Sequence, residues 1–227
     1  MSDLWLSRVR LRGDTGATTA LARLLVPDAG GARTAAAHRL VWALFADGPD
    51  RKRDFLWREE APGRFMTLSA RPPTGVPDLF DIDTKLFDPV LAAGDQLLFA
   101  LRANPVISRP TAPGQPSRRH DVVMDRLRTL PQKQRAAARL DTAIEAGREW
   151  LRRQGEANGF ACVGDVGVDG YEPVRIPRDG GQDARFSRLD FTGRLTVTDP
   201  AAFLHRLATG FGRARAFGCG LMLIRRA

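Results

Sequence analysis

The sequence has few cysteines and no long apolar run. Its two cysteines, Cys162 and Cys219, are too few for a disulfide framework or a zinc site, so a reducing compartment is expected. No run of about 18 apolar residues could span a membrane, and no signal peptide is recognisable among the first residues. We therefore expect a cytoplasmic protein that does not associate with membranes.

Several motifs of metal and cofactor chemistry are also missing. The chain has three histidines, His38, His120 and His205, and it contains no H-x-x-H, no C-x-x-C and no acidic triad. We therefore expect neither a metal ion nor another cofactor. The G-x-x-x-x-G-K-[ST] loop and the G-x-S-x-G turn are absent too, so the chain's glycines do not form a nucleotide P-loop or a serine-hydrolase elbow.

What the sequence has in excess is arginine. The formal net charge is +9, although lysine occurs only at Lys52, Lys85 and Lys133. A strongly basic chain favours nucleic acid or an anionic surface as its partner. A genome of high GC content, which encodes arginine in place of lysine, is the alternative explanation of this charge.

The first half of the chain predicts a strand, a helix and a hairpin. Residues 4–12 alternate apolar and polar side chains, as a half-buried strand does. Residues 34–45 carry an apolar stripe at helical spacing, with Thr34 as the cap. Residues 53–59 and 64–70 are two strands around an Ala-Pro-Gly turn. Residues 78–87 predict a further strand or a weak helix.

The second half predicts a longer series of elements. Residues 96–107 give the strongest strand signal, and a Pro- and Arg-rich loop follows at 109–120. Residues 121–124 are expected to pair back as a short strand. The remaining elements are a helix at 132–154, strands at 160–168 and 183–198, a helix at 199–208 and a closing strand at 221–224.

The two halves repeat the same order of elements without repeating the same sequence. The first half has the order β-α-β-β and the second the order β-(β)-α-β-β-α-β. Two βαββαβ units of the ferredoxin-like kind fit the 227 residues. We therefore predict an α+β protein with two tandem ferredoxin-like domains, at residues 1–93 and 94–227.

A glycine- and arginine-rich segment precedes the closing strand. Two Gly-x-Gly pairs bracket two arginines in the sequence GFGRARAFGCG, which begins at Gly210. Glycines let a backbone approach a phosphate chain, and arginines supply forked donors for its oxygens. The alternative is that the glycines only make tight turns. The residues of this loop that we expect to contact a polyanion are Gly210, Gly212, Arg213, Arg215, Gly218 and Gly220.

Further arginines occupy two other loops. One is the Pro-rich loop at 109–120, and the other lies between the strands predicted at 160–168 and 183–198. Either loop could contact the phosphates or the groove of a nucleic acid, and a solvated surface charge is the alternative for each arginine. The candidates are Arg118, Arg119, Arg175, Arg178 and Arg185.

RNA supplies its own nucleophile, the 2′-OH, so its cleavage requires no metal ion. The reaction requires in-line geometry, stabilisation of the phosphorane charge and proton transfer at two oxygens. A histidine can protonate the leaving 5′-oxygen, because its pKa lies near neutrality. His38 is the best candidate, since it lies at the edge of the apolar stripe of the helix predicted at 34–45. His205 competes with it, and either histidine could instead be structural.

Four segments of the sequence carry a family resemblance. They are AHRLVWALF at 37–45, RDFLWREE at 53–60, LRANP at 101–105 and GFGRARAFGCGL at 210–221. In this order they resemble the CRISPR RNA-processing endoribonucleases of type I-E systems, the CasE family. The resemblance extends over nearly the whole chain and implies two ferredoxin-like domains in tandem.

The resemblance also implies a reaction and partners. It implies metal-independent cleavage of CRISPR repeat RNA at the 3′ base of its hairpin, giving a 2′,3′-cyclic phosphate or 3′-phosphate and a 5′-hydroxyl. It implies that the enzyme stays bound to the product hairpin and joins other Cascade subunits. His38 falls on the family's catalytic histidine, and the four loop glycines fall on its glycine-rich loop. Residues 175–188 fall where the family inserts a basic element into the hairpin's groove.

One position departs from the family's pattern. Ala35 stands where members often carry a tyrosine one helical turn before the histidine, and the only tyrosine is Tyr171. The second proton-transfer role is therefore unassigned. This departure motivates an alternative function, a non-catalytic subunit that binds RNA hairpins in a ribonucleoprotein complex. A general basic DNA-binding protein is a third hypothesis.

Overall fold

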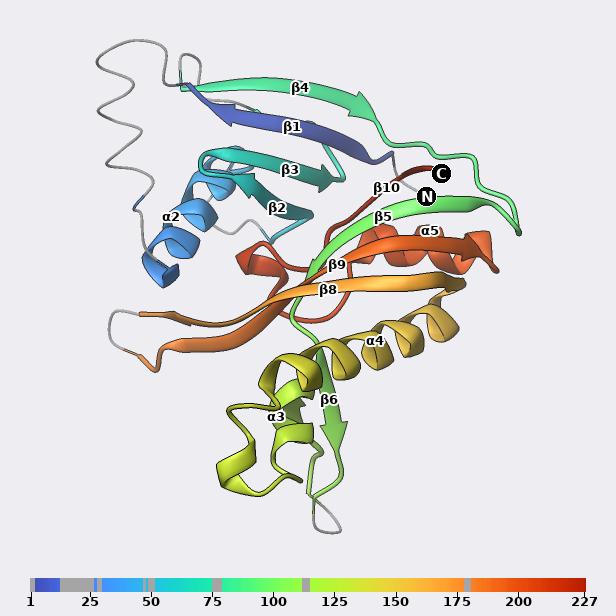
Figure 1. Cartoon of the computed structure of the whole chain (residues 1–227). Helices are drawn as coiled ribbons and strands as arrows, with labels where there is room; N and C mark the ends of the chain where they lie inside the picture. Colours follow the sequence, from blue (N-terminus) through green and yellow to red (C-terminus); the bar gives the residue numbers. More distant parts are fainter. Residues whose placement is uncertain are drawn as a thin grey trace.

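The computed structural model describes residues 3–12, 27, 30–46, 48, 52–74, 79–111, 115–177 and 181–227. Within these residues the strands form two antiparallel sheets of four strands each and a separate pair, β6 with β7. Figure 1 shows the two sheets as successive parts of one chain, with the β6–β7 pair projecting beyond α4. No helix of these residues is long and apolar enough to cross a membrane.

The first sheet comes from the N-terminal part of the chain. Its elements in sequence order are β1 (Trp5–Leu11), α2 (Gly30–Ala43), β2 (Phe55–Ala61), β3 (Arg64–Ser69) and β4 (Phe80–Leu86). The sheet order is β2-β3-β1-β4, with antiparallel neighbours. Because α2 connects β1 to β2 and β3 lies between them, this is the split βαβ arrangement of a ferredoxin-like domain. The strand alternative for residues 78–87 is confirmed.

The second sheet has the same topology with both helices present. Its order is β10-β5-β9-β8, again with antiparallel neighbours. Read from the other edge this is β8-β9-β5-β10, so β5, β8, β9 and β10 take the places that β1, β2, β3 and β4 have in the first sheet. The prediction of two tandem ferredoxin-like domains is confirmed. The elements are β5 (Gln96–Ala103), α4 (Arg139–Asn158), β8 (Phe160–Ile176), β9 (Ala184–Val197), α5 (Pro200–Thr209) and β10 (Met222–Arg226).

The boundary between the domains at residues 93 and 94 remains our proposal. These residues lie in the connection between β4 and β5, where residues 87–95 form neither helix nor strand. The backbone of this connection is joined to the second sheet, because the Gly94 N–H donates to the Val197 carbonyl at 2.8 Å.

An insertion between β5 and α4 differs from the sequence prediction. The strand predicted at 96–107 is divided into β5 and β6 (Val106–Arg109), because Pro105 lacks the N–H that a continuous ladder needs. The prediction of a short strand that pairs back is confirmed, but its bounds of 121–124 are wrong. The strand is β7 (Arg118–Asp121), which pairs with β6, and α3 (Val122–Leu127) begins directly after it. The Asp121 carboxylate accepts the Met124 N–H at 2.7 Å and thus begins α3 as its N-cap.

The start of the long helix was also predicted too early. Residues 132–134 form a short 3-10 helix, η1 (Gln132–Gln134), and α4 begins only at Arg139. At its other end α4 continues past the predicted end at 154 to Asn158 and closes on Gly159, which adopts a left-handed conformation (φ 76°).

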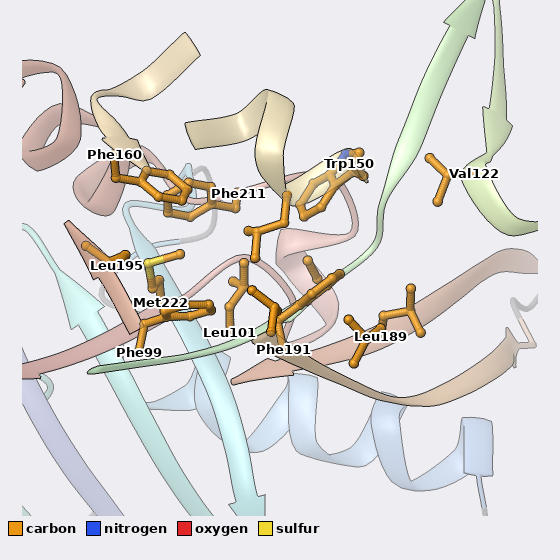
Figure 2. Packing of buried hydrophobic residues seen from close by; sticks show 14 of the residues in the cluster. Phe99, Leu101, Val122, Trp150, Phe160, Leu189, Phe191, Leu195, Phe211 and Met222 are labelled. Carbon is orange, nitrogen blue, oxygen red and sulfur yellow. The ribbon is translucent and has the colours of Figure 1, made fainter. Parts of the chain in front are cut away.

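The core of the second domain lies between its sheet and its helices. Alternate residues of β5, including Phe99 and Leu101, face the buried Trp150 of α4 together with Phe191 and Phe211 (Figure 2). Each fully buried side chain of this size contributes roughly 1.5–3 kcal/mol to the free energy of unfolding. This core holds α5 and β10 in place, and the glycine-rich segment connects these two elements. The Gly220 N–H of the segment also donates to the Arg102 carbonyl of β5.

A smaller apolar cluster joins the two domains. Leu56 and Leu68 of the first sheet pack with Leu221, the residue before β10, and all three are buried. Arg102 of β5 strengthens the same junction, because it pairs with Asp190 and also donates to the Glu59 carbonyl of β2 at 3.4 Å. The junction brings β2 and α2 next to the glycine-rich segment.

Candidate active site

His38 lies on α2 at the junction of the two domains. Leu40 and Val41 of the same helix are buried, whereas His38 is half-buried. Its ring centroid lies 5.3 Å from that of Phe217 and 6.1 Å from that of Trp42. The prediction that His38 lies at the edge of the apolar stripe, neither in the core nor fully solvated, is confirmed.

One backbone carbonyl of the second domain orients this histidine. The Nδ1 atom of His38 lies 2.7 Å from the Ala216 carbonyl oxygen. Since a carbonyl only accepts, Nδ1 carries the proton, and in the neutral ring Nε2 has the free lone pair. The same oxygen accepts the indole N–H of Trp57 at 3.0 Å. Ala216 therefore receives one hydrogen bond from α2 and one from β2.

The surroundings hold the pKa of His38 below its usual value of 6.5. Burial has the largest effect and lowers the pKa, because the imidazolium is desolvated. The hydrogen bond to Ala216 opposes this by favouring the charged ring. The positive charges of Arg53 and Arg39 lower the pKa further. The neutral imidazole is thus favoured near neutrality.

The four predicted loop glycines all adopt left-handed or related backbone conformations, with φ between 67° and 96°. Gly210, Gly218 and Gly220 are buried, and Gly212 is half-buried. A Cβ atom at Gly212 would lie 2.7 Å from the Asn104 carbonyl oxygen, and one at Gly218 would lie 3.1 Å from the Trp57 ring. The close approach that these glycines permit is therefore to protein groups, and their contact with RNA stays a prediction.

Three arginines near the glycine loop differ in their surroundings. Arg213 is exposed, and Arg215 is half-buried and donates to the Thr209 carbonyl. Arg53, immediately before β2, has a buried Nη1 atom without a hydrogen-bond partner in the described part of the chain. Its pKa is lowered by burial and by the charge of Arg215. An anion at this junction would find the Arg53 guanidinium, whose charge also acts on His38.

The β8–β9 hairpin extends past α2 as a long arm (Figure 1). Arg175 and Arg185 lie opposite each other on its two strands and are both exposed, with Asp183 beside them. The arm lies against the start of α2, so closely that a Cβ at Gly31 would collide with the Arg175 carbonyl oxygen. Two predicted basic residues are thus brought to the side of the helix that carries His38. Arg178 lies outside the described residues.

The other predicted basic pair lies elsewhere. Arg118 and Arg119 are exposed on β7, in the pair of strands that projects beyond α4 (Figure 1). His120 is next to them, and its Nδ1 atom lies 3.2 Å from Arg128. His205 is exposed on α5. Neither of these two histidines has a carbonyl contact like that of His38 with Ala216 in the described part of the chain.

The structure offers no tyrosine beside His38. Position 35 is a half-buried alanine on α2. Tyr171 lies on β8, where its hydroxyl donates to the Asp121 carboxylate at 3.1 Å, and burial raises its pKa. A phenol with a raised pKa that already donates to a carboxylate is a poor proton acceptor.

Metal ligands do not gather in the described residues. Nowhere among them do three or more histidine, cysteine, aspartate or glutamate side chains form a group that could hold a metal ion. Cys162 and Cys219 are both free, and burial raises the pKa of Cys162 to about 11 and that of Cys219 to about 12. Neither thiol is thus prepared to act as a nucleophile.

Sequence reasoning missed several residues that surround His38. Trp57 and Ala216 make the carbonyl contact, Arg53 brings positive charge, and Phe217 and Phe186 make a stacked pair of rings beside the histidine. No spacing in the sequence connects β2, β9 and the loop to α2. Only the segments that carry the family resemblance, which contain Trp57, Ala216 and Phe217, mark these positions.

The chain matches known proteins over nearly its whole length. A family model described as CRISPR associated protein matches residues 4–226. Among curated proteins, the CRISPR system Cascade subunit CasE of Escherichia coli is 29% identical over 192 residues, which cover 82% of this chain and 88% of that protein. The CRISPR-associated endoribonuclease Cse3 of Thermus thermophilus is 29% identical over 153 residues, covering 62% and 60% of the two chains.

A solved structure has the same fold. The CRISPR endoribonuclease Cse3 bound to a 19-nucleotide RNA superimposes with a TM-score of 0.67 at 23% identity, and the match covers 99% of each chain. At this identity the likeness concerns the fold, and the residues around His38 must be judged by their own geometry.

Proposed function

Because the chain belongs to the CRISPR-associated protein family, and within it to the CasE group of type I-E systems, we propose that it is an endoribonuclease that processes CRISPR repeat RNA and acts as a Cascade subunit. The relatives' names support this activity, and the chain's charge of +9 suits an RNA partner. The observation that carries the proposal is the placement of His38. Its Nδ1 atom is held by the Ala216 carbonyl, so Nε2 is the ring nitrogen that would face the substrate.

The proposed reaction uses the RNA's own 2′-OH. This oxygen attacks the adjacent phosphorus as the bond to the 5′-oxygen breaks, and His38, in its imidazolium form, gives the proton on Nε2 to the departing 5′-oxygen and becomes the neutral ring protonated at Nδ1. The products are a 2′,3′-cyclic phosphate and a 5′-hydroxyl, and no metal ion takes part. Arg53, whose charge acts on His38, and Arg215, whose charge acts on Arg53, would stabilise the charge of the phosphorane. The acceptor of the 2′-OH proton stays unassigned.

RNA binding is proposed for both basic regions. Arg175, Arg178 and Arg185 of the arm would contact the hairpin, with Arg118 and Arg119 as a second region of contact. Arg213 and Arg215 of the glycine loop would contact the RNA backbone. The loop itself packs closely against both domains, because it has glycine at positions 210, 212, 218 and 220. Retention of the cleaved hairpin follows if these contacts do not involve the bond that is broken.

One assay tests the proposal. Repeat RNA labelled at both ends is incubated with the protein in EDTA at pH 6.5. We expect one cut, a 5′-hydroxyl on the downstream fragment, and no cut when the nucleotide before the cleaved bond is 2′-deoxy. The variant His38→Ala should bind the RNA as the parent does but cleave it about 100- to 10,000-fold more slowly. Binding without any cleavage by the parent would instead support a non-catalytic RNA-binding subunit.

A further inference from the structure

We infer that Trp57 is a positioning residue for His38 and that it acts through the Ala216 carbonyl. This inference rests on the proposed function, since it concerns how the general acid of that reaction is held. Trp57 is buried and therefore does not contact the substrate. Its indole N–H fixes the oxygen to which His38 Nδ1–H donates.

The Ala216 carbonyl can accept two hydrogen bonds from side chains because it lies in a short turn of the loop. It belongs to a 3-10 turn, η2 (Arg215–Phe217), which lies between two left-handed residues, Ala214 (φ 52°) and Gly218 (φ 79°). Within the turn the Phe217 N–H donates to Ala214. A carbonyl oxygen has two lone pairs, so the Trp57 and His38 donors can occupy one each. A turn of only three residues has few hydrogen bonds of its own, and the two side chains add two more.

Trp57 is itself held rigidly. It is 1% exposed, and its ring packs edge-on against Phe65 with centroids 6.0 Å apart. Gly218 covers its ring so closely that a Cβ atom there would lie 3.1 Å from the indole. An N–H on an immobile ring defines the place of the carbonyl, and the carbonyl defines the tautomer and the tilt of His38. Trp57 thus couples the first domain's sheet to the second domain's loop.

The consequence for the reaction is specific. A general acid must point its Nε2–H bond at the leaving oxygen, and a small displacement of this bond lowers the reaction rate strongly. Without the Trp57 N–H, the carbonyl is held less firmly, so the imidazolium that donates to it through Nδ1–H is less well oriented. The neutral ring, for the same reason, populates both tautomers. RNA binding, which depends on the arginines, is not affected by this change.

The test removes the N–H and keeps the ring. Trp57→Phe trims the indole, and a site-specific benzothiophene analogue of tryptophan replaces only the N–H with sulfur. We expect both to cleave saturating RNA about tenfold more slowly than the parent, with the dissociation constant for uncleaved RNA unchanged within about twofold. The matched control is Trp150→Phe, which removes another buried indole that packs on the same loop at Gly212 but does not reach Ala216.

A second readout requires no RNA. The ¹⁵N chemical shifts of the three histidines report the tautomer of each neutral ring, and the parent should show His38 protonated at Nδ1. The inference predicts mixed tautomers for His38 in both Trp57 variants and the parental signal in Trp150→Phe. Parental tautomer and parental cleavage rate in the benzothiophene variant would overturn it, even if Trp57→Phe fails to fold. If the parent does not cleave RNA but the tautomer changes as expected, the proposed function fails and the positioning role stands.

Discussion

Phe186 of β9 stacks on Phe217 of η2, with ring centroids 5.6 Å apart and planes inclined by 14°. Phe217 in turn lies 5.3 Å from the His38 ring. The basic arm is therefore in contact with the histidine through a single intervening ring. Arg185, the neighbour of Phe186 on the same strand, is exposed. An RNA held by the arm would thus be held by the same strand that packs beside His38.

The first prediction concerns this stacked pair. Phe186→Ala should reduce the cleavage rate at saturating RNA by about two- to tenfold, since an aromatic pair contributes about 0.5–1.5 kcal/mol to its arrangement. Phe186→Leu, which keeps an apolar side chain, should retain more activity. Single-turnover cleavage with each variant measures this effect. Equal rates for the alanine variant and the parent would show that the arm and His38 are not coupled through these rings.

The second prediction concerns pH. Because burial holds the pKa of His38 below 6.5, the protonated acid becomes scarce as pH rises through that pKa, and the cleavage rate should fall across the neutral range. The pH–rate profile of the parent measures this decline. A rate that rises steadily from pH 5.5 to 8 would contradict His38 as the general acid.

The same lowered pKa predicts a dependence of stability on pH. Protonation of His38 is less favourable in the folded state than in the unfolded state, so its contribution to stability is present above pH 6.5 and is lost as pH falls through the folded-state pKa. His38→Gln removes this contribution. The difference in free energy of unfolding between parent and variant should therefore shrink on acidification, as denaturant titrations at pH 7.5 and 5.5 can measure.

Most of the fold followed from periodicity, and the exceptions have local causes. The β-α-β-β order of the first domain and the strands and helices of the second were predicted from alternating and helical patterns. One error lies at the start of α2, which begins at Gly30, so that Thr34 lies inside the helix and is not its cap. The others lie in the insertion after β5. There Pro105 divides a single apolar run, and Asp121 starts a helix by capping it where the apolar pattern predicted a strand.

The site was less predictable than the fold. The position of His38 at the edge of a helical stripe could be derived from the sequence, because helical spacing fixes which side a residue faces. Its partners could not be derived, since Ala216 lies 178 residues further along the chain and contributes only a backbone carbonyl. The loop glycines were predicted as phosphate contacts, whereas their close neighbours in the structure are Trp57, Asn104 and other protein groups.

The fourth prediction follows from the packing of Gly218. Gly218→Ala places a Cβ 3.1 Å from the Trp57 ring at a φ of 79°, which should lower the free energy of unfolding by about 1–3 kcal/mol. Cleavage should fall more than RNA binding, because the shift displaces the neighbouring Ala216 carbonyl. Denaturant unfolding, filter binding and single-turnover cleavage separate the three effects. Gly164→Ala is the control, since its φ is also positive but no other group lies within 4 Å of the added atom.

The last prediction concerns the exposed arginine pair of the arm. Arg175 and Arg185 face each other across β8 and β9, and only Asp183 among the described residues pairs with them. Two like charges on opposed positions repel, and a phosphate between them would relieve this cost. Replacing either by alanine should weaken binding of the repeat hairpin and reduce the slope of log K against log salt by about 1.

A matched control decides whether this loss is specific. Arg152 is similarly exposed but lies on α4 in ion pairs with Glu149 and Glu156, so Arg152→Ala should leave both affinity and salt slope near the parental values. Cleavage of bound RNA by the arm variants should proceed at the parental rate, because His38 and its carbonyl are untouched. If Arg175→Ala and Arg185→Ala bind the hairpin as the parent does over about 50–200 mM salt, the arm carries no RNA contact at these positions. The Arg118 and Arg119 pair would then be the next to replace.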